Sequence, residues 1–171
     1  MTHDFKIKLP KAKTKINTND FGEFIWWCNN LNITPENLLL LTDEELKACY
    51  FSRQKIIYAR ELAIAVRDKK LTLKRLGSKH ENEVRHELKK IKGIGDWTVD
   101  VYLMHSLQRT DLFPLGDIAL VNSLKEVKQL HPKISREEML KIAEPWRPYR
   151  TIASMILWHA YIKKRNIKLQ G

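Results

Sequence analysis

The chain has 171 residues, 43% of them hydrophobic and 30% charged, so it is long and apolar enough to fold as one domain around a single core. Its 31 lysines and arginines outnumber 20 acidic residues and give a formal charge of +11. Such an excess attracts polyanions, among which nucleic acid is the commonest partner. The charge favours a nucleic-acid partner, although basic proteins with other roles also exist.

The composition excludes several other classes of protein. Two cysteines, Cys28 and Cys49, cannot supply a disulfide framework or the four ligands of an iron–sulfur cluster. The histidines contain no HExxH pair, so we expect no required metal or other cofactor. No stretch approaches the roughly 18 apolar residues of a membrane span, and the N-terminus lacks the apolar region of a signal peptide. We therefore expect a cytoplasmic protein with no membrane partner.

The chain begins with a lysine-rich segment, residues 1–19, that shows no sustained period. It is either a flexible basic arm over phosphates or a solvated tail. From Phe21 onward the pattern predicts a helix, because apolar residues recur at spacings of three and four: Phe21, Phe24, Ile25, Cys28 and Leu31. These patterns predict a basic N-terminal segment over 1–19 and one helical domain over 20–171.

Helix start signals then recur along the chain. Thr34 before Pro35 predicts a capped helix with proline in its first turn. Ser52 opens a segment from Arg53 to about Lys69, whose apolar stripe consists of Ile56, Ala59, Ala63 and Val66. Capping boxes are predicted for three pairs: Thr42 with Glu45, Ser78 with Glu81, and Ser135 with Glu138.

Further helices are expected near residues 80–91, 97–107, 118–130, 136–144 and 149–165. No run alternates convincingly between apolar and polar residues with the period of two that a strand requires. The sequence therefore predicts an all-α fold with about eight helices and short connections.

A glycine pair separates the predicted helices 80–91 and 97–107. Gly93 and Gly95 flank the apolar Ile94, an arrangement that suits a tight reversal open to a ligand. The second helix would present unpaired amides and its positive dipole end to a phosphate, next to the nearby lysines Lys89, Lys90 and Lys92. The alternative is an αα-hairpin whose glycines only end one helix and start the next.

Several segments resemble one known family. The stretch Lys92-Gly93-Ile94-Gly95-Asp96-Trp97-Thr98 resembles the hairpin of the helix-hairpin-helix (HhH-GPD) DNA glycosylases. About twenty residues later these enzymes carry D-x-F-P-x-x-D, which Asp111-Leu112-Phe113-Pro114-Leu115-Gly116-Asp117 matches. Two further segments are similar to the alkylation-repair branch, the DNA-3-methyladenine glycosylases of type II: Phe51-Ser52-Arg53-Gln54-Lys55 and Trp146-Arg147-Pro148-Tyr149-Arg150.

The resemblance implies a site for removing damaged bases. Asp117 takes the position of the catalytic carboxylate, which stabilises positive charge on the sugar or orients the attacking water. Trp97 and Trp158 take positions that line the base pocket, where an indole face attracts an alkylated, positively charged base. The resemblance further implies contacts with DNA from Lys92, Gly93, Ile94, Gly95, Thr98, Arg147 and Arg150, and allows a monovalent cation on the main-chain carbonyls of the hairpin.

Each of these residues also has a plainer interpretation. An aspartate before an apolar run, such as Asp117, is usually only a helix N-cap, although the two roles can coincide. Trp158 taken alone fits a core position, and Arg147 and Arg150 could simply decorate a helix start.

One absence bears on the mechanism that the resemblance implies. Bifunctional relatives carry a lysine two residues after the second hairpin glycine, where it forms a Schiff base with the sugar. That position is Trp97 here. We therefore expect a monofunctional enzyme, whose hydrolysis of the base leaves an abasic site in an uncut strand.

The first third of the chain departs from the family. Full-length members of this branch have an N-terminal β-rich domain and an early helix with a Gln-Gln-φ-Ser type sequence near the wedge that fills the gap left by the flipped base. Residues 1–33 contain neither. Three interpretations follow: a compact active variant, a truncated product with little turnover, or one part of a protein completed by another chain. Without a wedge, opening a duplex costs a few kcal/mol of stacking, so single-stranded or mispaired substrates could be preferred.

The sequence thus predicts a monomeric, monofunctional DNA glycosylase that excises alkylated or otherwise damaged purines from DNA during base excision repair. The main alternative is a truncated, non-catalytic helix-hairpin-helix module that only binds DNA. A third interpretation, an RNA-binding helical protein, rests on charge alone.

Overall fold

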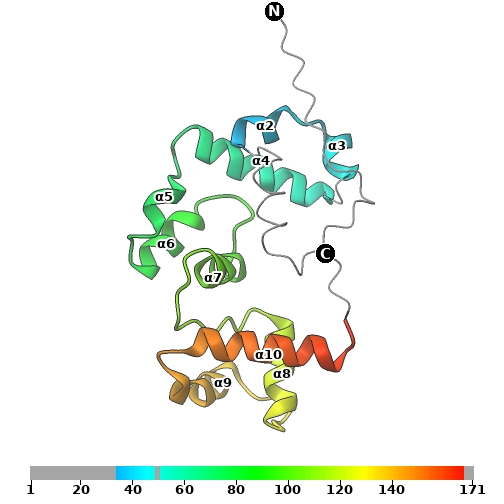
Figure 1. Ribbon diagram of the computed structural model, residues 1–171, viewed down its shortest axis with the longest axis vertical. Helices are drawn as coiled ribbons and strands as arrows, with labels where there is room; N and C mark the ends of the chain where they lie inside the picture. The colour runs from blue at the N-terminus through cyan, green and yellow to red at the C-terminus, as the bar shows by residue number, and fades with distance from the viewer. Residues whose placement is uncertain (1–33, 49–50, 168–171) are drawn as a thin grey trace, which may run out of the picture. The chain divides into compact units, whose positions relative to one another are not determined.

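The computed structural model describes residues 34–48 and 51–167 (Figure 1). The basic segment 1–19 and the helix predicted from Phe21 lie outside the described residues. The described chain forms two compact units, one of residues 34–73 with 91–93 and the other of residues 74–90 with 94–167. Each unit is described by itself.

The first unit contains three helices, α2 (Pro35–Leu40), α3 (Asp43–Ala48) and α4 (Arg53–Arg67). The predicted caps are confirmed: the hydroxyl of Thr34 accepts from the amide of Asn37, and that of Ser52 accepts from the amide of Lys55. A hydroxyl at the N-cap satisfies an amide that has no partner inside the helix. The starts of α2 and α4 therefore follow from local sequence.

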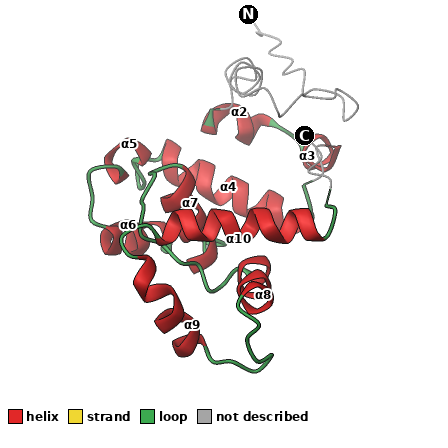
Figure 2. Ribbon diagram, turned by 60° about the horizontal axis from the view of Figure 1, so that its bottom comes forward, coloured by secondary structure: helices red, strands yellow, loops and turns green. Residues whose placement is uncertain are grey.

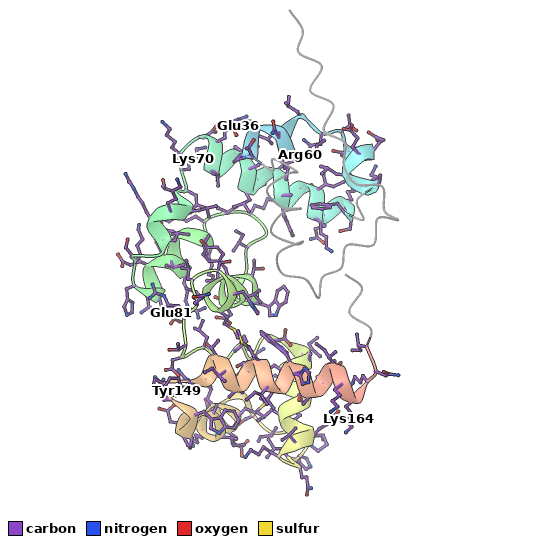
Figure 3. The ribbon with its side chains drawn as sticks, in the orientation of Figure 1. Glu36, Arg60, Lys70, Glu81, Tyr149 and Lys164 are labelled. Atoms are coloured by element: carbon purple, nitrogen blue, oxygen red, sulfur yellow. The ribbon has the colours of Figure 1, made fainter. Side chains whose placement is uncertain are left out.

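Arg60 ties α4 to the turn between α2 and α3. Its guanidinium donates to the carbonyl of Leu41 and to the carboxylate of Asp43, each over 2.8 Å, and Figure 3 shows it on the part of α4 beside α2. Carbonyls at the end of a helix have no partner inside it, so the arginine satisfies one of them.

The second unit holds the remaining helices, shown with the loops between them in Figure 2. In chain order these are α5 (Leu73–Leu76, beginning at the last residue of the first unit), α6 (Glu81–Leu88), α7 (Asp96–His105), α8 (Ile118–Val127), α9 (Arg136–Ala143), a 3-10 turn (Glu144–Trp146) and α10 (Arg150–Lys164). The described residues contain helices and loops but no strand, which confirms the predicted all-α fold.

One hydrophobic core cluster of the second unit lies where α8, α9 and α10 meet. Its buried side chains are Leu120, Leu124, Met139 and Leu157. Helix α10 packs along α8, and Tyr149 and Lys164 mark its two ends in Figure 3. Burial of four such side chains stabilises the unit by several kcal/mol, since each contributes about 1.5–3 kcal/mol. This packing supports the loop and the helix start that carry the candidate site.

One of the three predicted capping boxes is wrong. The boxes at Thr42 and Ser135 are present, but α6 is capped by His80, whose side chain accepts from the amide of Asn82 and whose own amide donates to the carboxylate of Glu83. Ser78 is not a cap, because its hydroxyl donates to the carbonyl of Arg75 at the end of α5. The short α5 was not expected from the sequence. Ser78 bonds to the end of this helix and is therefore not the cap of α6.

Candidate active site

Asp117 is the N-cap of α8. Its Oδ1 accepts a hydrogen bond of 2.8 Å from the amide of Leu120, in the first turn of the helix. The positive end of the helix dipole favours a negative charge at this position. The carboxylate is therefore held in one orientation by its own helix, and the N-cap role expected from local sequence is present.

The second oxygen of this carboxylate is held by Trp97. The indole Nε1 donates to Asp117 Oδ2 over 2.8 Å, from a residue twenty positions earlier in the chain. Trp97 lies in the first turn of α7, directly after the hairpin, and is 50% exposed. A large indole that is half exposed yet fixed by a hydrogen bond leaves apolar surface open beside the carboxylate.

The pKa of Asp117 is lowered by this environment. Burial is the largest single influence and by itself raises the pKa, since removing water disfavours the charged form. Hydrogen bonds to the carboxylate outweigh burial: the amide of Leu120 contributes most, followed by the indoles of Trp97 and Trp158 and the amide of Ala119. Asp117 is therefore an ionised carboxylate at neutral pH, ready to stabilise nearby positive charge.

Trp158 comes to the same site from α10. Its side chain is half-buried and packs against the core cluster of the second unit. Its indole also helps to lower the pKa of the Asp117 carboxylate. The imidazole of His105, at the end of α7, stacks on its indole with 5.9 Å between ring centroids and 15° between planes. The structure thus brings together the three residues that sequence reasoning placed at the catalytic centre and the base pocket.

The hairpin between α6 and α7 uses its two glycines differently. Gly93 has a φ of +93°, and a Cβ there would lie 2.1 Å from the ring of Tyr58, so no other residue fits. Gly95 has an ordinary φ of −100° as the N-cap of α7, and a Cβ there would meet no atom within 4 Å. Gly93 is needed for the turn, whereas Gly95 leaves the first amides of α7 open to a ligand.

The other predicted DNA-binding residues of the hairpin lie at or near the surface. Lys92 and Thr98 are exposed, and Ile94 is half-buried. Lys89 forms an ion pair of 2.7 Å with Asp96, in the first turn of α7, so part of the nearby positive charge is neutralised. A surface groove next to the hairpin is lined by Arg85, His86, Lys89, Lys90 and Asp96.

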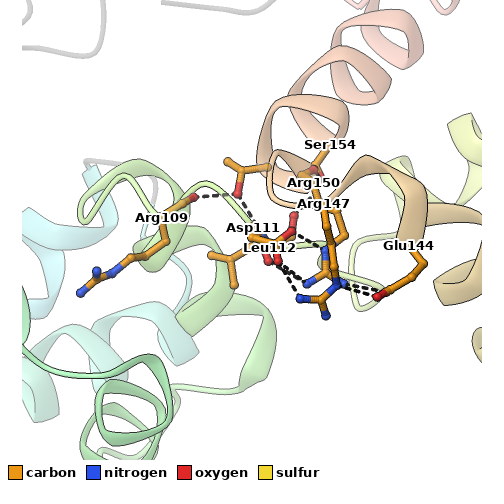
Figure 4. Close-up of polar contacts among 8 residues, drawn as sticks. Arg109, Asp111, Leu112, Glu144, Arg147, Arg150 and Ser154 are labelled. Carbon is orange, nitrogen blue, oxygen red and sulfur yellow. Dashed lines mark hydrogen bonds and ion pairs between the residues drawn. The ribbon is translucent and has the colours of Figure 1, made fainter.

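Arg147 and Arg150 are both engaged by Asp111 (Figure 4). Arg150 contacts it through Nε at 2.6 Å, and Arg147 through Nη1 at 2.9 Å. The two differ in exposure, since the side chain of Arg150 is 12% exposed and that of Arg147 is 51% exposed. Arg150 is largely buried and joins the start of α10 to the loop that carries Asp111, while Arg147 also faces solvent.

The loop that leads to Asp117 is further held by two small polar residues of α10 (Figure 4). The hydroxyl of Thr151 donates to the carbonyl of Arg109 and accepts from the amide of Leu112. Ser154 donates to the carbonyl of Leu112. Buried polar groups of a loop must find partners inside the protein, and α10 supplies them.

Sequence reasoning gave no role to Asp111, Thr151, Ser154 or His105. Thr151 and Ser154 could have been noticed, because polar residues three apart on the buried face of a helix need partners. Nothing in the local sequence identifies His105 as the neighbour of Trp158, since their contact is long-range.

The described part of the chain shows no metal centre and no membrane segment. Its His, Cys, Asp and Glu side chains form no group of three or more that could hold a metal ion. Within residues 34–48 and 51–167, every helix is too short or too polar to span a bilayer.

Comparison with known proteins identifies the family. Residues 14–148 match the model of the HhH-GPD superfamily base excision DNA repair proteins, and this match covers the hairpin, Trp97 and Asp117. The chain belongs to this superfamily. HhH-GPD membership confirms the resemblance seen in the sequence and agrees with the all-α fold.

Two curated relatives show how far the similarity extends. The chain is 35% identical over 134 residues to YfjP of Bacillus subtilis, covering 78% of this chain and 46% of the relative. It is 36% identical over 127 residues to DNA-3-methyladenine glycosylase 1 of Schizosaccharomyces pombe, covering 73% and 55%. The chain thus spans about half the length of these curated relatives.

Solved structures agree with this assignment. The S. pombe 3-methyladenine DNA glycosylase Mag1, solved in complex with abasic DNA, has a TM-score of 0.67 at 32% identity, covering 73% of this chain and 61% of that one. A DNA-3-methyladenine glycosidase from Bacillus halodurans has a TM-score of 0.64 at 28% identity, covering 95% and 73%.

Proposed function

We propose that this protein is a monofunctional DNA glycosylase that hydrolyses the N-glycosidic bond of alkylated purines in DNA. The observation that carries the proposal is the carboxylate of Asp117, fixed at the start of α8 and hydrogen-bonded to the half-exposed indole of Trp97. The DNA-3-methyladenine glycosylases among its relatives support the class of substrate. In this proposal residues 20–171 act as one glycosylase domain, with residues 1–19 as a basic extension.

The proposed chemistry follows from the state of Asp117. When the bond between C1′ and the base nitrogen breaks, the electron pair leaves with the base and positive charge develops on the sugar. An ionised carboxylate beside the sugar stabilises this charge. Water then adds its oxygen to C1′ and loses a proton, and the product is an abasic site.

The hydrogen bonds of Asp117 also restrict which bases can leave. Both of its oxygens already accept hydrogen bonds, and its pKa is lowered, so it is a weak base toward water. Catalysis then depends on charge stabilisation and on a base that departs readily. An alkylated purine meets this requirement because its positive charge weakens the glycosidic bond, and the indoles of Trp97 and Trp158 attract that charge.

The hairpin is proposed as the DNA anchor of the same domain. Gly95 leaves the first amides of α7 open, and Lys92, which precedes them in the sequence, and Thr98, which follows, are both exposed. Backbone amides at a helix start bind a phosphate without reading sequence. A monovalent cation on the hairpin carbonyls, a monomeric state and a cytoplasmic site of action belong to the same proposal.

The alternative is a non-catalytic helix-hairpin-helix module that only binds DNA. A pure phosphate binder needs neither Asp117 nor the indole bonded to it, so the geometry favours the enzyme.

Excision from a labelled oligonucleotide carrying one alkylated purine tests the choice, using the wild type and Asp117→Asn. Asparagine caps a helix as well as aspartate does, so the variant removes the charge and keeps the fold. We expect strand cleavage after alkali for the wild type only, no cleavage without alkali, and equal DNA binding by both proteins. Absence of cleavage by the wild type across a panel of lesions, with binding intact, would establish the binding module.

A further inference from the structure

His105 and Trp158 form an aromatic pair that the proposed mechanism does not use. His105 is the last residue of α7 and is exposed, whereas Trp158 is half-buried in the middle of α10. Their rings are nearly parallel, at 15°, with centroids 5.9 Å apart. This is the offset-stacked arrangement that aromatic rings prefer.

Trp158 connects this pair to the candidate site. Its indole packs against the core cluster around Leu157 and also helps to lower the pKa of the Asp117 carboxylate. The core and the carboxylate limit where the indole lies, while the stacked imidazole limits how its plane can tilt. His105 therefore contacts the ring that is the candidate wall of the base pocket, from a helix other than the one that carries it.

We propose that His105 is a specificity-determining residue that acts through Trp158. By holding the plane of the indole, it makes the pocket favour a positively charged purine over a neutral purine of similar size. The inference rests on the proposed function, because it takes Trp158 to be part of the base pocket.

The physical reason is a difference in how two kinds of base depend on the orientation of the indole. Attraction between a cation and an aromatic ring requires the charge to lie over the ring face, where the quadrupole is negative. Contact between a neutral base and the same ring comes mainly from dispersion and buried area, which are not directional. Loss of the imidazole should therefore weaken binding of a cationic base more than binding of a neutral one.

Binding of free nucleosides tests the inference without any excision step. The probes are 1-methyladenosine, which is positively charged at neutral pH, and its neutral isomer N6-methyladenosine. Their dissociation constants are measured by quenching of tryptophan fluorescence for the wild type, His105→Ala and His105→Phe. Trp158→Phe identifies the part of the signal that comes from Trp158, and His159→Ala, an exposed histidine of α10, is the matched control.

The wild type should bind the cation more tightly than its neutral isomer. This preference should fall about three- to thirty-fold in His105→Ala, the range expected for a cation–π contact. His105→Phe restores a stacked ring and should restore the preference, and His159→Ala should leave it unchanged. The inference is overturned if the wild type shows no preference, or if His105→Ala weakens both probes equally.

Excision assays on the same variants separate this inference from the proposed function. His105→Ala should raise KM for a cationic alkylated purine, with a much smaller change in kcat and in the KM for a neutral lesion. If the nucleoside preference depends on His105 but no protein cleaves DNA, the proposed function fails and the inference stands. If DNA is cleaved and the preference is the same in every variant, the inference alone fails.

Discussion

Trp97 Nε1 and Asp117 Oδ2 are 2.8 Å apart, joined by a hydrogen bond between the first turn of α7 and the N-cap of α8. Because the opposite carboxylate oxygen is held by the amide of Leu120, the two bonds fix the plane of the carboxylate. One indole therefore serves two purposes in the proposed site, since it orients the carboxylate and offers a half-exposed aromatic face. The two purposes can be separated by mutation.

Trp97→Phe keeps an aromatic ring but removes the hydrogen-bond donor. A hydrogen bond to a charged group is worth about 1.5–3 kcal/mol, so we expect kcat on an alkylated purine to fall at least about ten-fold. Affinity for undamaged DNA should not change. Trp97→Ala removes the ring as well and should also raise KM. Single-turnover excision and DNA titration measure these effects, and equal kcat values for the wild type and Trp97→Phe would contradict the assigned hydrogen bond.

The pH dependence of activity should reflect the lowered pKa of Asp117. A lowered pKa keeps the carboxylate ionised as the pH falls, so loss of this charge should not reduce kcat/KM between pH 8 and about 5, given the usual value near 4. The same shift contributes folding stability above the unfolded-state pKa, and this stability is lost as the pH falls through the folded-state pKa. In Trp97→Phe the acid limb should move to higher pH, because one bond to the carboxylate is gone. A profile of kcat/KM against pH for both proteins tests this.

Alanine at the first hairpin glycine should lower protein stability, whereas alanine at the second should weaken DNA binding. Gly93→Ala places a Cβ against the ring of Tyr58 at a left-handed backbone position, and should lower the free energy of unfolding by at least about 1–2 kcal/mol. Gly95→Ala meets no atom within 4 Å and should fold normally, but it adds a methyl group at the N-cap, next to the open amides in the chain, and should weaken DNA binding. Urea unfolding and DNA titration at fixed salt distinguish the two. A stable Gly93→Ala variant would show that the turn can rearrange.

Replacing Arg150 should lower protein stability, whereas replacing Arg147 should mainly affect DNA binding, although both arginines bind Asp111. Arg150→Met leaves Asp111 without its least exposed partner and should destabilise the protein by about 1.5–3 kcal/mol, the worth of a hydrogen bond to a charged group. Arg147→Met removes two solvent-exposed ion pairs, with Asp111 and with Glu144, and should change stability little. If Arg147 contacts phosphate, as the resemblance implies, its replacement should weaken binding to all DNA sequences and reduce the salt dependence. Denaturant midpoints and titrations at several salt concentrations measure both effects.

Features that depend on neighbours three or four residues apart could be predicted from the sequence. The caps at Thr34, Ser52 and Ser135 are such features, because a side chain there bonds an amide within its own turn. The period of apolar residues gave the all-α class, and the glycine at 93 gave the tight turn. The error at Ser78 arose because two nearby groups competed for one hydroxyl, and the carbonyl of Arg75 has it.

The sequence by itself therefore determined the family, the helices other than α5 and the position of the hairpin, since these follow from local spacing and ordered motifs. Only the tertiary structure decided which distant side chains meet. Asp117 could be named from its motif, but its bond to Trp97 spans twenty residues, and the contacts of Arg150 with Asp111 and of His105 with Trp158 depend on how helices pack. Such contacts form when buried apolar faces bring helices together, and no local pattern specifies them.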